Sequence, residues 1–289
     1  MIYAGVDAGS RAIKVVLFDT ARLAILSTAI ADQGVQQARL AEELFEHALR
    51  EAGVARPDVA AVVATGYGRN AVPFAATTIT EITCHARGVW HLAPAARTII
   101  EIGGQDSKLI VLDDEGRVRD FSMNDRCAAG SGRFLEVLAE RLGVSLTGLG
   151  ELSRRSAKPA LISNTCVVFA ETEIIGLLAS GIPPADLAAG VQEAIAARVV
   201  GMMGRTTERP VYFTGGVALL PGMVQALEKV LGCAPEIPLL PQYTGALGAA
   251  LLAARVKTSA TIPFQPDKRI TNHPSRNEGD TTIINKDTL

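Results

Sequence analysis

The sequence contains few cysteines and none of the short motifs that mark the commonest metal sites and hydrolases. Its 289 residues include four cysteines and four histidines. No C-x-x-C pair is present, which excludes a zinc ribbon and a ferredoxin-type cluster held by one chain. The absence of H-E-x-x-H, of G-x-S-x-G and of any Gly-Lys dipeptide excludes zincins, common serine hydrolases and P-loop ATPases.

A strong net charge and a long apolar run are also missing. The net charge is −2, from 28 basic and 30 acidic residues that are mixed along the chain, which argues against a nucleic-acid or membrane-surface footprint. Charged residues interrupt the first apolar stretch, so it is not a signal peptide. The longest polar-free run near the end, residues 244–254, is too short to span a bilayer. We expect a soluble cytoplasmic protein that binds neither nucleic acid nor membrane.

The first third of the chain has the element order of an α/β protein. Residues 1–19 hold two apolar runs around a Gly-rich turn, which predicts strand, turn, strand. A third strand, a helix, a buried strand and a second helix follow, at residues 23–31, 35–53, 59–66 and 77–92. A Gly-rich turn over Thr65–Asn70 is interpreted as structural.

The same order then starts again. Residues 96–123 predict three strands, and the later elements are helices at Gly132–Leu142, Cys166–Ser180 and Pro184–Arg205, a strand at 210–216, and helices at 221–232 and Thr244–Arg255. A repeat of this kind predicts two related α/β lobes with a cleft between them. We expect lobes at 1–95 and 96–256, with the last helix free to pack back on the first lobe. Residues 257–289 are polar and aperiodic, which predicts a disordered tail.

Three segments carry the pattern of a phosphate site. In the first, Asp7 ends a strand and is placed to hold Mg²⁺ directly or through water, while the turn after it offers backbone amides to phosphate oxygens. The predicted nucleotide-binding residues of this segment are Gly9, Ser10, Arg11, Ala12 and Lys14.

The second segment, "IEIGGQDSK", repeats this arrangement, so that the two turns would hold the phosphates from both sides. Its candidate catalytic residues are Glu101, Gln105 and Asp106, and Gly103 and Gly104 supply amides. Gln105 or Asp106 is a candidate to orient the attacking water, since phosphoryl transfer depends on positioning and charge neutralisation; Asp106 serves equally well as a turn cap.

The third segment is a strand that ends at Gly215 and Gly216, followed by Val217. Two glycines there would let a purine and its ribose approach the backbone. The three segments together resemble the actin, hexokinase and heat-shock-chaperone ATPase superfamily over residues 1–256. That resemblance implies duplicated ribonuclease-H-like lobes with a nucleotide cleft between them.

Two of the cysteines precede predicted helices. Cys127 lies before "AAGSGRFLEVLAERL" and Cys166 before "VVFAETEIIGLLASG", with Ser163, Asn164 and Thr165 as capping candidates for the second helix. A thiolate at a helix N-terminus is electrostatically favoured. Two cysteines cannot complete a four-cysteine cluster shell, whereas a two-fold dimer would supply four. From the residues alone, a nucleophile, a metal ligand and a small packing residue all stay open.

The segments "NDRCAAGSGRFLE", "SNTCVVFAETEII", "EIGGQDSK" and "TGGVALLPG" resemble one family specifically. They are similar to the ATP-dependent activators of 2-hydroxyacyl-CoA dehydratases and to the related ATPase subunits of benzoyl-CoA reductase. The resemblance implies a homodimer with one bridging [4Fe–4S] cluster, and Cys127 and Cys166 fall on the ligand positions. Cys84 and Cys233 do not, and we interpret them as buried thiols.

The resemblance also implies a function. Reduced ferredoxin or flavodoxin would load the cluster, and Mg²⁺ and ATP would drive one low-potential electron to an iron–sulfur acyl-CoA dehydratase or reductase. Alternatives are a permanent subunit of a benzoyl-CoA reductase-type complex, a small-molecule kinase of the same fold, and a nucleotide-gated binding or filament protein. His85 beside Cys84 is interpreted as structural, and Arg126 and Arg133 as solvated charges or part of a basic collar around Cys127.

Overall fold

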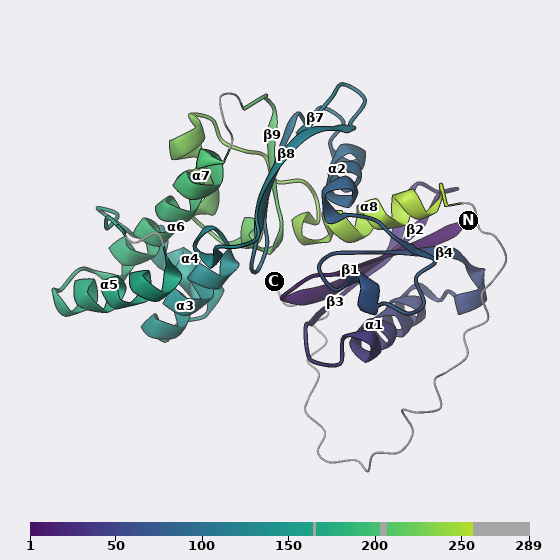
Figure 1. Ribbon diagram of the computed structural model, residues 1–289, viewed down its shortest axis with the longest axis horizontal. Helices are drawn as coiled ribbons and strands as arrows, with labels where there is room; N and C mark the ends of the chain where they lie inside the picture. The colour runs from purple at the N-terminus through teal and green to yellow at the C-terminus, as the bar shows by residue number, and fades with distance from the viewer. Residues whose placement is uncertain (164–165, 203–206, 257–289) are drawn as a thin grey trace, which may run out of the picture. The chain divides into compact units, whose positions relative to one another are not determined.

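The computed structural model describes residues 1–163, 166–202 and 207–256 (Figure 1). Contacts divide the chain into two compact units. Unit 1 is Met1–Cys84 together with the residues from Gly245 onward, and unit 2 is His85–Thr244. The cleft expected between the lobes stays a prediction. The tail predicted at 257–289, and the part of the predicted third helix of the second lobe that falls on 203–206, lie outside the described residues.

Unit 1 is built on a five-stranded sheet with the strand order β3-β2-β1-β4-β5. The first three strands pair antiparallel, and β4 and β5 continue the sheet in parallel to β1. The strands are β1 (Ile2–Ala8), β2 (Ala12–Asp19), β3 (Ala24–Asp32), β4 (Val59–Thr65) and β5 (Thr77–Thr78), with helices α1 (Gln37–Ala52), the start of α2 (Glu81–Leu92) and most of α8 (Thr244–Ala253).

Helices cover both faces of this sheet (Figure 1). The apolar residues of α1 recur at helical spacing and are buried against β1, β2 and β3; the helix stops at Gly53, whose φ of 63° suits a glycine. On the opposite face α8 lies so close to β1 that a Cβ on Gly5 would overlap the carbonyl of Ala246. The last helix therefore belongs to unit 1.

Unit 2 has a four-stranded sheet with the order β8-β7-β6-β9, in which β6 pairs antiparallel with β7 and parallel with β9. Its strands are β6 (Thr98–Ile102), β7 (Ser107–Leu112), β8 (Val118–Asn124) and β9 (Val211–Thr214). Its helices are α3 (Gly132–Leu142), α4 (Leu146–Ser153), α5 (Val167–Ala179), α6 (Pro184–Gly201) and α7 (Met223–Leu231), with short 3₁₀ turns η3 (Ala128–Gly130) and η4 (Gly216–Leu219). Helix α4, whose Ser145 hydroxyl accepts a hydrogen bond from Gly148 N at 3.0 Å, was not predicted.

The two sheets repeat one topology, as the sequence predicted. In each, the third, second and first strands of the unit run antiparallel and the fourth strand pairs in parallel with the first. In unit 2 the core forms where α3, α6 and α7 pack on β6, β7 and β9. Among the described residues, no helix combines the length and hydropathy that a bilayer span needs.

Candidate functional site

The β1–β2 hairpin of unit 1 brings a carboxylate and a lysine together. Asp7 lies opposite Lys14 in the strand register, and the Lys14 ammonium donates to the Asp7 carboxylate at 3.3 Å. Asp7 is only 5% exposed. The turn is closed by a hydrogen bond from Gly9 N to Ala12 O at 3.0 Å. Of the other residues predicted here, Ser10 is half-buried, and Arg11 is exposed and pairs with Asp32 at 3.2 Å.

A glycine that follows the neighbouring strand supports this hairpin. Gly66 comes directly after β4 and has a φ of 87°, a conformation that other residues rarely adopt. A Cβ at this position would lie 2.5 Å from an Asp7 carboxylate oxygen. Two residues later, Gly68 N donates to Ala8 O at 2.8 Å. The turn at Thr65–Asn70 thus fits tightly around Asp7, which only glycine permits.

The β6–β7 hairpin of unit 2 repeats the arrangement with a stronger ion pair. Glu101 lies opposite Lys108 in the register. The ammonium of Lys108 is 2.8 Å from the Glu101 carboxylate and 2.9 Å from that of Asp106. Lys108 is 1% exposed, so a buried ammonium lies between two carboxylates at the base of the turn. Gln105 is exposed at the tip, and Gly103 N donates to Asp106 O at 3.0 Å.

Sequence reasoning missed Lys108. The signal was available, because Asp7 and Lys14 are seven residues apart and Glu101 and Lys108 have the same spacing. Aligning the two halves on their strand–turn–strand segments would have paired the lysines. The structure brings Glu101 and Asp106 together through this one ammonium.

Gly215 plays the part in unit 2 that Gly66 plays in unit 1. It follows β9 with a φ of 91°, and a Cβ here would overlap the Ile102 carbonyl and lie 2.7 Å from a Glu101 carboxylate oxygen. Gly216 is exposed and has open space around its Cα, whereas Val217 is buried. Only Gly216 of the three predicted residues therefore has a free surface for a ligand.

A chain of buried hydroxyl groups fixes the strand end that precedes Gly215. Thr214 is hydrogen bonded to Thr244 at 2.8 Å, and Thr244 to His85 Nδ1 at 2.9 Å. The Thr214 hydroxyl donates to the carbonyl of Pro241, so Thr244 donates to Thr214 and accepts from His85. His85 thus has a structural hydrogen-bonding role, as predicted.

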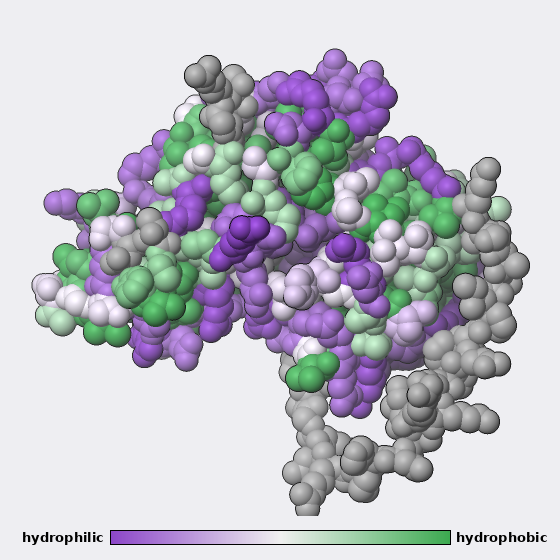
Figure 2. Space-filling view, viewed as in Figure 1, coloured by the Kyte–Doolittle hydropathy of each residue, from purple (hydrophilic) through white to green (hydrophobic). Residues whose placement is uncertain are grey.

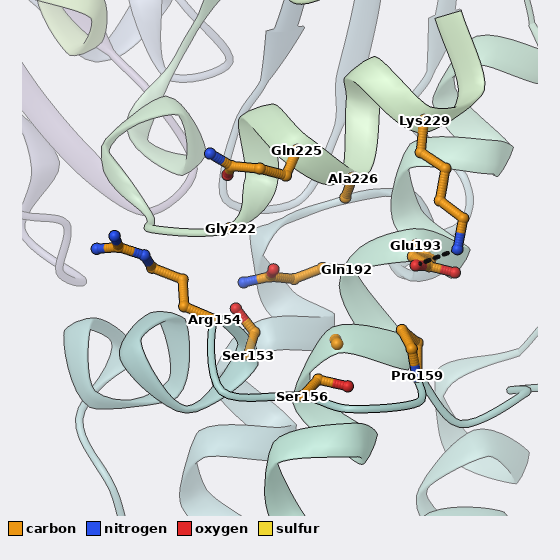
Figure 3. A pocket seen from close by; sticks show the side chains of 11 residues that line it. Ser153, Arg154, Ser156, Pro159, Gln192, Glu193, Gly222, Gln225, Ala226 and Lys229 are labelled. Carbon is orange, nitrogen blue, oxygen red and sulfur yellow. Dashed lines mark hydrogen bonds and ion pairs between the residues drawn. The ribbon is translucent and has the colours of Figure 1, made fainter. Parts of the chain in front are cut away.

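A pocket of about 350 Å³ opens in unit 2 where α4, α6 and α7 meet (Figure 3). The side chains of Ser153 and Gln192 converge below Gly222, and Gln192 donates to Pro221 O at 3.0 Å. Glu193 and Lys229, which form an ion pair at 2.7 Å, lie at the other end. The wall at Gly222 is continuous in sequence with the Gly215–Gly216 loop, so the pocket adjoins the segment predicted to meet a purine.

The two candidate cysteines differ in their surroundings. Cys166 directly precedes α5 and is exposed. Apolar side chains are exposed over this helix, among them Val168 and Phe169 (Figure 2). The Ser163 hydroxyl donates to Glu173 at 2.6 Å and does not cap the helix, and the other two capping candidates, Asn164 and Thr165, lie outside the described residues.

Cys127 is not at the N-terminus of α3, which corrects the geometry assumed from the sequence. It precedes the short turn η3, and α3 begins only at Gly132. The first amides of α3 donate to the hairpin carbonyls, Gly132 N to Gly103 O and Arg133 N to Gly104 O, both at 2.8 Å. Those amides are therefore not aimed at the Cys127 thiol.

The other two cysteines, and the two arginines that flank Cys127, differ in burial and in their partners. Cys84 is buried, as predicted, and burial raises the pKa of its thiol to about 12. Cys233 is half-buried, so the prediction of a buried thiol was wrong for it. Arg126 is exposed, and Arg133 forms an ion pair with Glu136 at 3.0 Å.

The described residues of a single chain offer few side chains that could bind a metal together. Within the described ranges, no three His, Cys, Asp or Glu residues are grouped as a metal site would require. Cys127 is half-buried and Cys166 exposed, and neither forms a disulfide. Thiolates are the usual ligands of iron–sulfur clusters. The thiols of Cys127 and Cys166 therefore have the chemistry of cluster ligands, and one chain supplies two of them.

The family model and the relatives that match this chain all indicate the same family of ATPases. A model described as the BadF/BadG/BcrA/BcrD ATPase family matches residues 4–253. The activator of lactoyl-CoA dehydratase from Anaerotignum propionicum is 42% identical over 86% of this chain and 96% of that relative. A subunit of the benzoyl-CoA reductase from Thauera aromatica is 34% identical over 88% of this chain and 93% of that relative.

Comparison with solved structures indicates the same family. The activator of the 2-hydroxyisocaproyl-CoA dehydratase from Clostridium difficile, with bound ADPNP, has a TM-score of 0.82 and 39% identity over 90% of this chain and 100% of that chain. A ROK family glucokinase from Streptomyces griseus, with a TM-score of 0.53 and 16% identity over 89% and 100% of the two chains, shares the fold alone. These likenesses confirm the predicted fold class of the actin and hexokinase superfamily. The chain belongs to the BadF/BadG/BcrA/BcrD ATPase family.

Proposed function

We propose that this chain is an ATP-dependent activator that passes a low-potential electron to an iron–sulfur acyl-CoA dehydratase. One observation carries the proposal: the chain is 42% identical to a dehydratase activator over 86% of this chain and 96% of that relative. The two carboxylate–lysine hairpins support it. The relative with bound ADPNP supports ATP as the nucleotide.

In this proposal the two hairpins bind the phosphates of ATP. The backbone amides after Asp7 and after Glu101 face phosphate oxygens, and Asp7 holds Mg²⁺ directly or through a water molecule. Lys108 holds the carboxylates of Glu101 and Asp106 in place, and Gln105 at the exposed tip orients the attacking water. Catalysis is then largely a matter of positioning and charge.

The base of the nucleotide would use the pocket beside Gly222. Gly216 offers an exposed backbone to the ribose, and the amide of Gln225 and the hydroxyl of Ser153 line the pocket with hydrogen-bonding groups. Arg154, which also lines it, is able to stack its planar guanidinium on a purine. A pocket that combines apolar surface with a few hydrogen-bonding groups suits a purine base.

Cys127 and Cys166 of each protomer of a homodimer would hold one [4Fe–4S] cluster. Such a cluster, when bound, stores and releases a single electron at low potential. Two observations support this assignment: Cys166 is exposed at the start of α5, as a ligand shared with a second protomer must be, and Cys127 is only half-buried. Reduced ferredoxin or flavodoxin is the proposed donor.

A permanent place in a benzoyl-CoA reductase-type complex is the second candidate. The related subunit of that reductase is 34% identical, below the 42% of the dehydratase activator, which favours the stand-alone activator. Copurification with large partner subunits would reverse this preference. A kinase function has only the shared fold in its favour.

The test is a cysteine substitution followed by anaerobic purification. We expect Cys166→Ser to fold and to bind Mg·ATP but to contain no iron, whereas the wild type holds about four irons per dimer. Cys233→Ser is the control, because its half-buried thiol lies outside the proposed ligand pair and should leave the iron content unchanged. Full iron content in Cys166→Ser would remove Cys166 from the site.

A further inference from the structure

The segment 124–133 is bonded at both ends to the β6–β7 hairpin. At its start, Asn124 lies opposite Ser107, the first residue of β7, in the β7–β8 register. At its end, Gly132 N and Arg133 N donate to the carbonyls of Gly103 and Gly104 at 2.8 Å each. The segment therefore forms a loop that begins and ends on the turn proposed to bind phosphate.

Cys127 lies in the middle of this loop, and one side chain holds it there. The Asn124 amide nitrogen donates to Cys127 O at 2.7 Å, and its amide oxygen accepts from Cys127 N at 3.1 Å. Both backbone polar groups of Cys127 are thus bonded to the same side chain. Since the direction of the Cα–Cβ bond follows from the backbone, Asn124 sets the position from which the Cys127 side chain projects.

The loop packs so closely against the hairpin that it has little room to move independently of it. A Cβ on Gly130 would lie 2.9 Å from the Asn124 amide nitrogen and 3.4 Å from the Ser107 hydroxyl. A Cβ on Gly132 would lie 3.0 Å from the Gly103 carbonyl oxygen and 3.2 Å from Val217. Glycine is needed at both positions because hairpin and loop are in direct contact, and close packing transmits displacement.

We propose that Asn124 is a positioning residue that couples the Gly103–Asp106 turn to Cys127. A nucleotide that draws the turn toward its phosphates pulls on β7 and on the start of α3, and Asn124 passes this displacement to the Cys127 backbone. The inference rests on the proposed function, since it requires the turn to bind nucleotide. It adds to that function one positioning residue, Asn124, and a path within unit 2 from the turn to Cys127.

Amide hydrogen exchange with mass spectrometry tests this route. Anaerobically purified wild-type protein is compared with and without Mg·ADPNP, for peptides that cover residues 103–107 and 124–131. We expect the nucleotide to slow exchange in both peptides. In Asn124→Ala the slowing at 103–107 should persist, and the slowing at 124–131 should fall by about five- to tenfold, because two hydrogen bonds to Cys127 are lost.

Two further variants sharpen the result. Asn124→Asp keeps an acceptor for Cys127 N and loses the donor to Cys127 O, so we expect it to restore part of the slowing at 124–131, and it serves in place of Asn124→Ala if that variant does not fold. Ser122→Ala, two residues earlier on the same face of β8, should behave as wild type.

The outcomes separate the coupling from the function beneath it. Wild-type slowing at 103–107 without any at 124–131, or undiminished slowing at 124–131 in the Asn124 variants, overturns the coupling and leaves nucleotide binding standing. No response in either wild-type peptide overturns the proposed nucleotide site itself.

Discussion

The hairpins of the two units share one plan and differ in what they are attached to. In unit 1 the half-buried Lys14 meets a single carboxylate at 3.3 Å, and the Gly9 carbonyl accepts from the Gln33 side chain at 2.8 Å. In unit 2 the buried Lys108 meets two carboxylates, and the equivalent carbonyl, that of Gly103, accepts from the backbone of α3.

This difference indicates a division of labour between two copies of one supersecondary unit. The unit 1 turn is bonded to Gln33 after β3 and, at Ala8, to the backbone of Gly68, rather than to the first amides of an α-helix. The unit 2 turn is bonded to the first amides of α3. When it shifts, it must either displace that helix and the Cys127 loop or break these hydrogen bonds. The unit 1 hairpin is thus suited to binding and the unit 2 hairpin to transmission.

The largest expected effect comes from removing the buried ammonium. Lys108→Met should lower the free energy of unfolding by about 3–5 kcal/mol, because Glu101 and Asp106 would be left near each other without a counter-charge. Lys14→Met should cost less than Lys108→Met, since Lys14 is more exposed and its loss leaves one carboxylate without its partner instead of two. Urea denaturation measures both.

The double variant Lys108→Met with Glu101→Gln tests whether the unpaired carboxylates cause the loss of stability. It should regain part of the loss, since one of the two stranded charges is gone. Equal destabilisation by Lys14→Met and Lys108→Met would show that the two ion pairs do not differ in the way their burial indicates.

The second prediction concerns which carboxylate holds the metal. Asp7→Asn should lower Mg·ATP turnover by about 100-fold, with the iron content and the absorption spectrum of the protein unchanged. Glu101→Gln, its counterpart in unit 2, tests whether the two acids are equivalent. Hydrolysis at the wild-type rate in Asp7→Asn would exclude Asp7 from the site, and an equal loss in both variants would contradict the asymmetry drawn above.

The smallest difference in stability between matched variants of the two units is expected at the glycines that follow β4 and β9. Gly66→Ala and Gly215→Ala should each cost at least about 1–2 kcal/mol of stability, since both sites have a positive φ and no room for a Cβ. Gly216→Ala is the matched control, because a Cβ there meets open space, and its melting temperature should stay close to that of wild type. A tolerated Gly215→Ala would contradict the tight fit against Glu101.

Much of the fold follows from the sequence, because its elements are long and strongly patterned. The predicted helix at Gly132–Leu142 has those same bounds in the structure, and the helix predicted at 35–53 spans Gln37–Ala52. Helix α4 was missed because it is short and contains Gly148 and Gly150, which lower helix propensity. Its cap at Ser145 was the available signal.

The site was less predictable than the fold, for a physical reason. Motif residues such as Asp7 and Gly215 can be identified because their chemistry is local. The burial of Lys108 and the clamp of Asn124 on Cys127 depend on strand register and on which segments pack together, and neither is encoded within a short window. A lysine in a strand is ordinarily expected at the surface.

The position of α8 bears on how the chain folds during synthesis. Unit 2 is contiguous, whereas the sheet of unit 1 lacks the helix on one face until residues 244–253 have left the ribosome. The first strands to emerge must therefore wait, with Gly5 and its apolar neighbours uncovered, for the last helix of the fold. The N-terminal half of the chain therefore exposes this apolar surface during synthesis, and transiently exposed apolar surface favours aggregation.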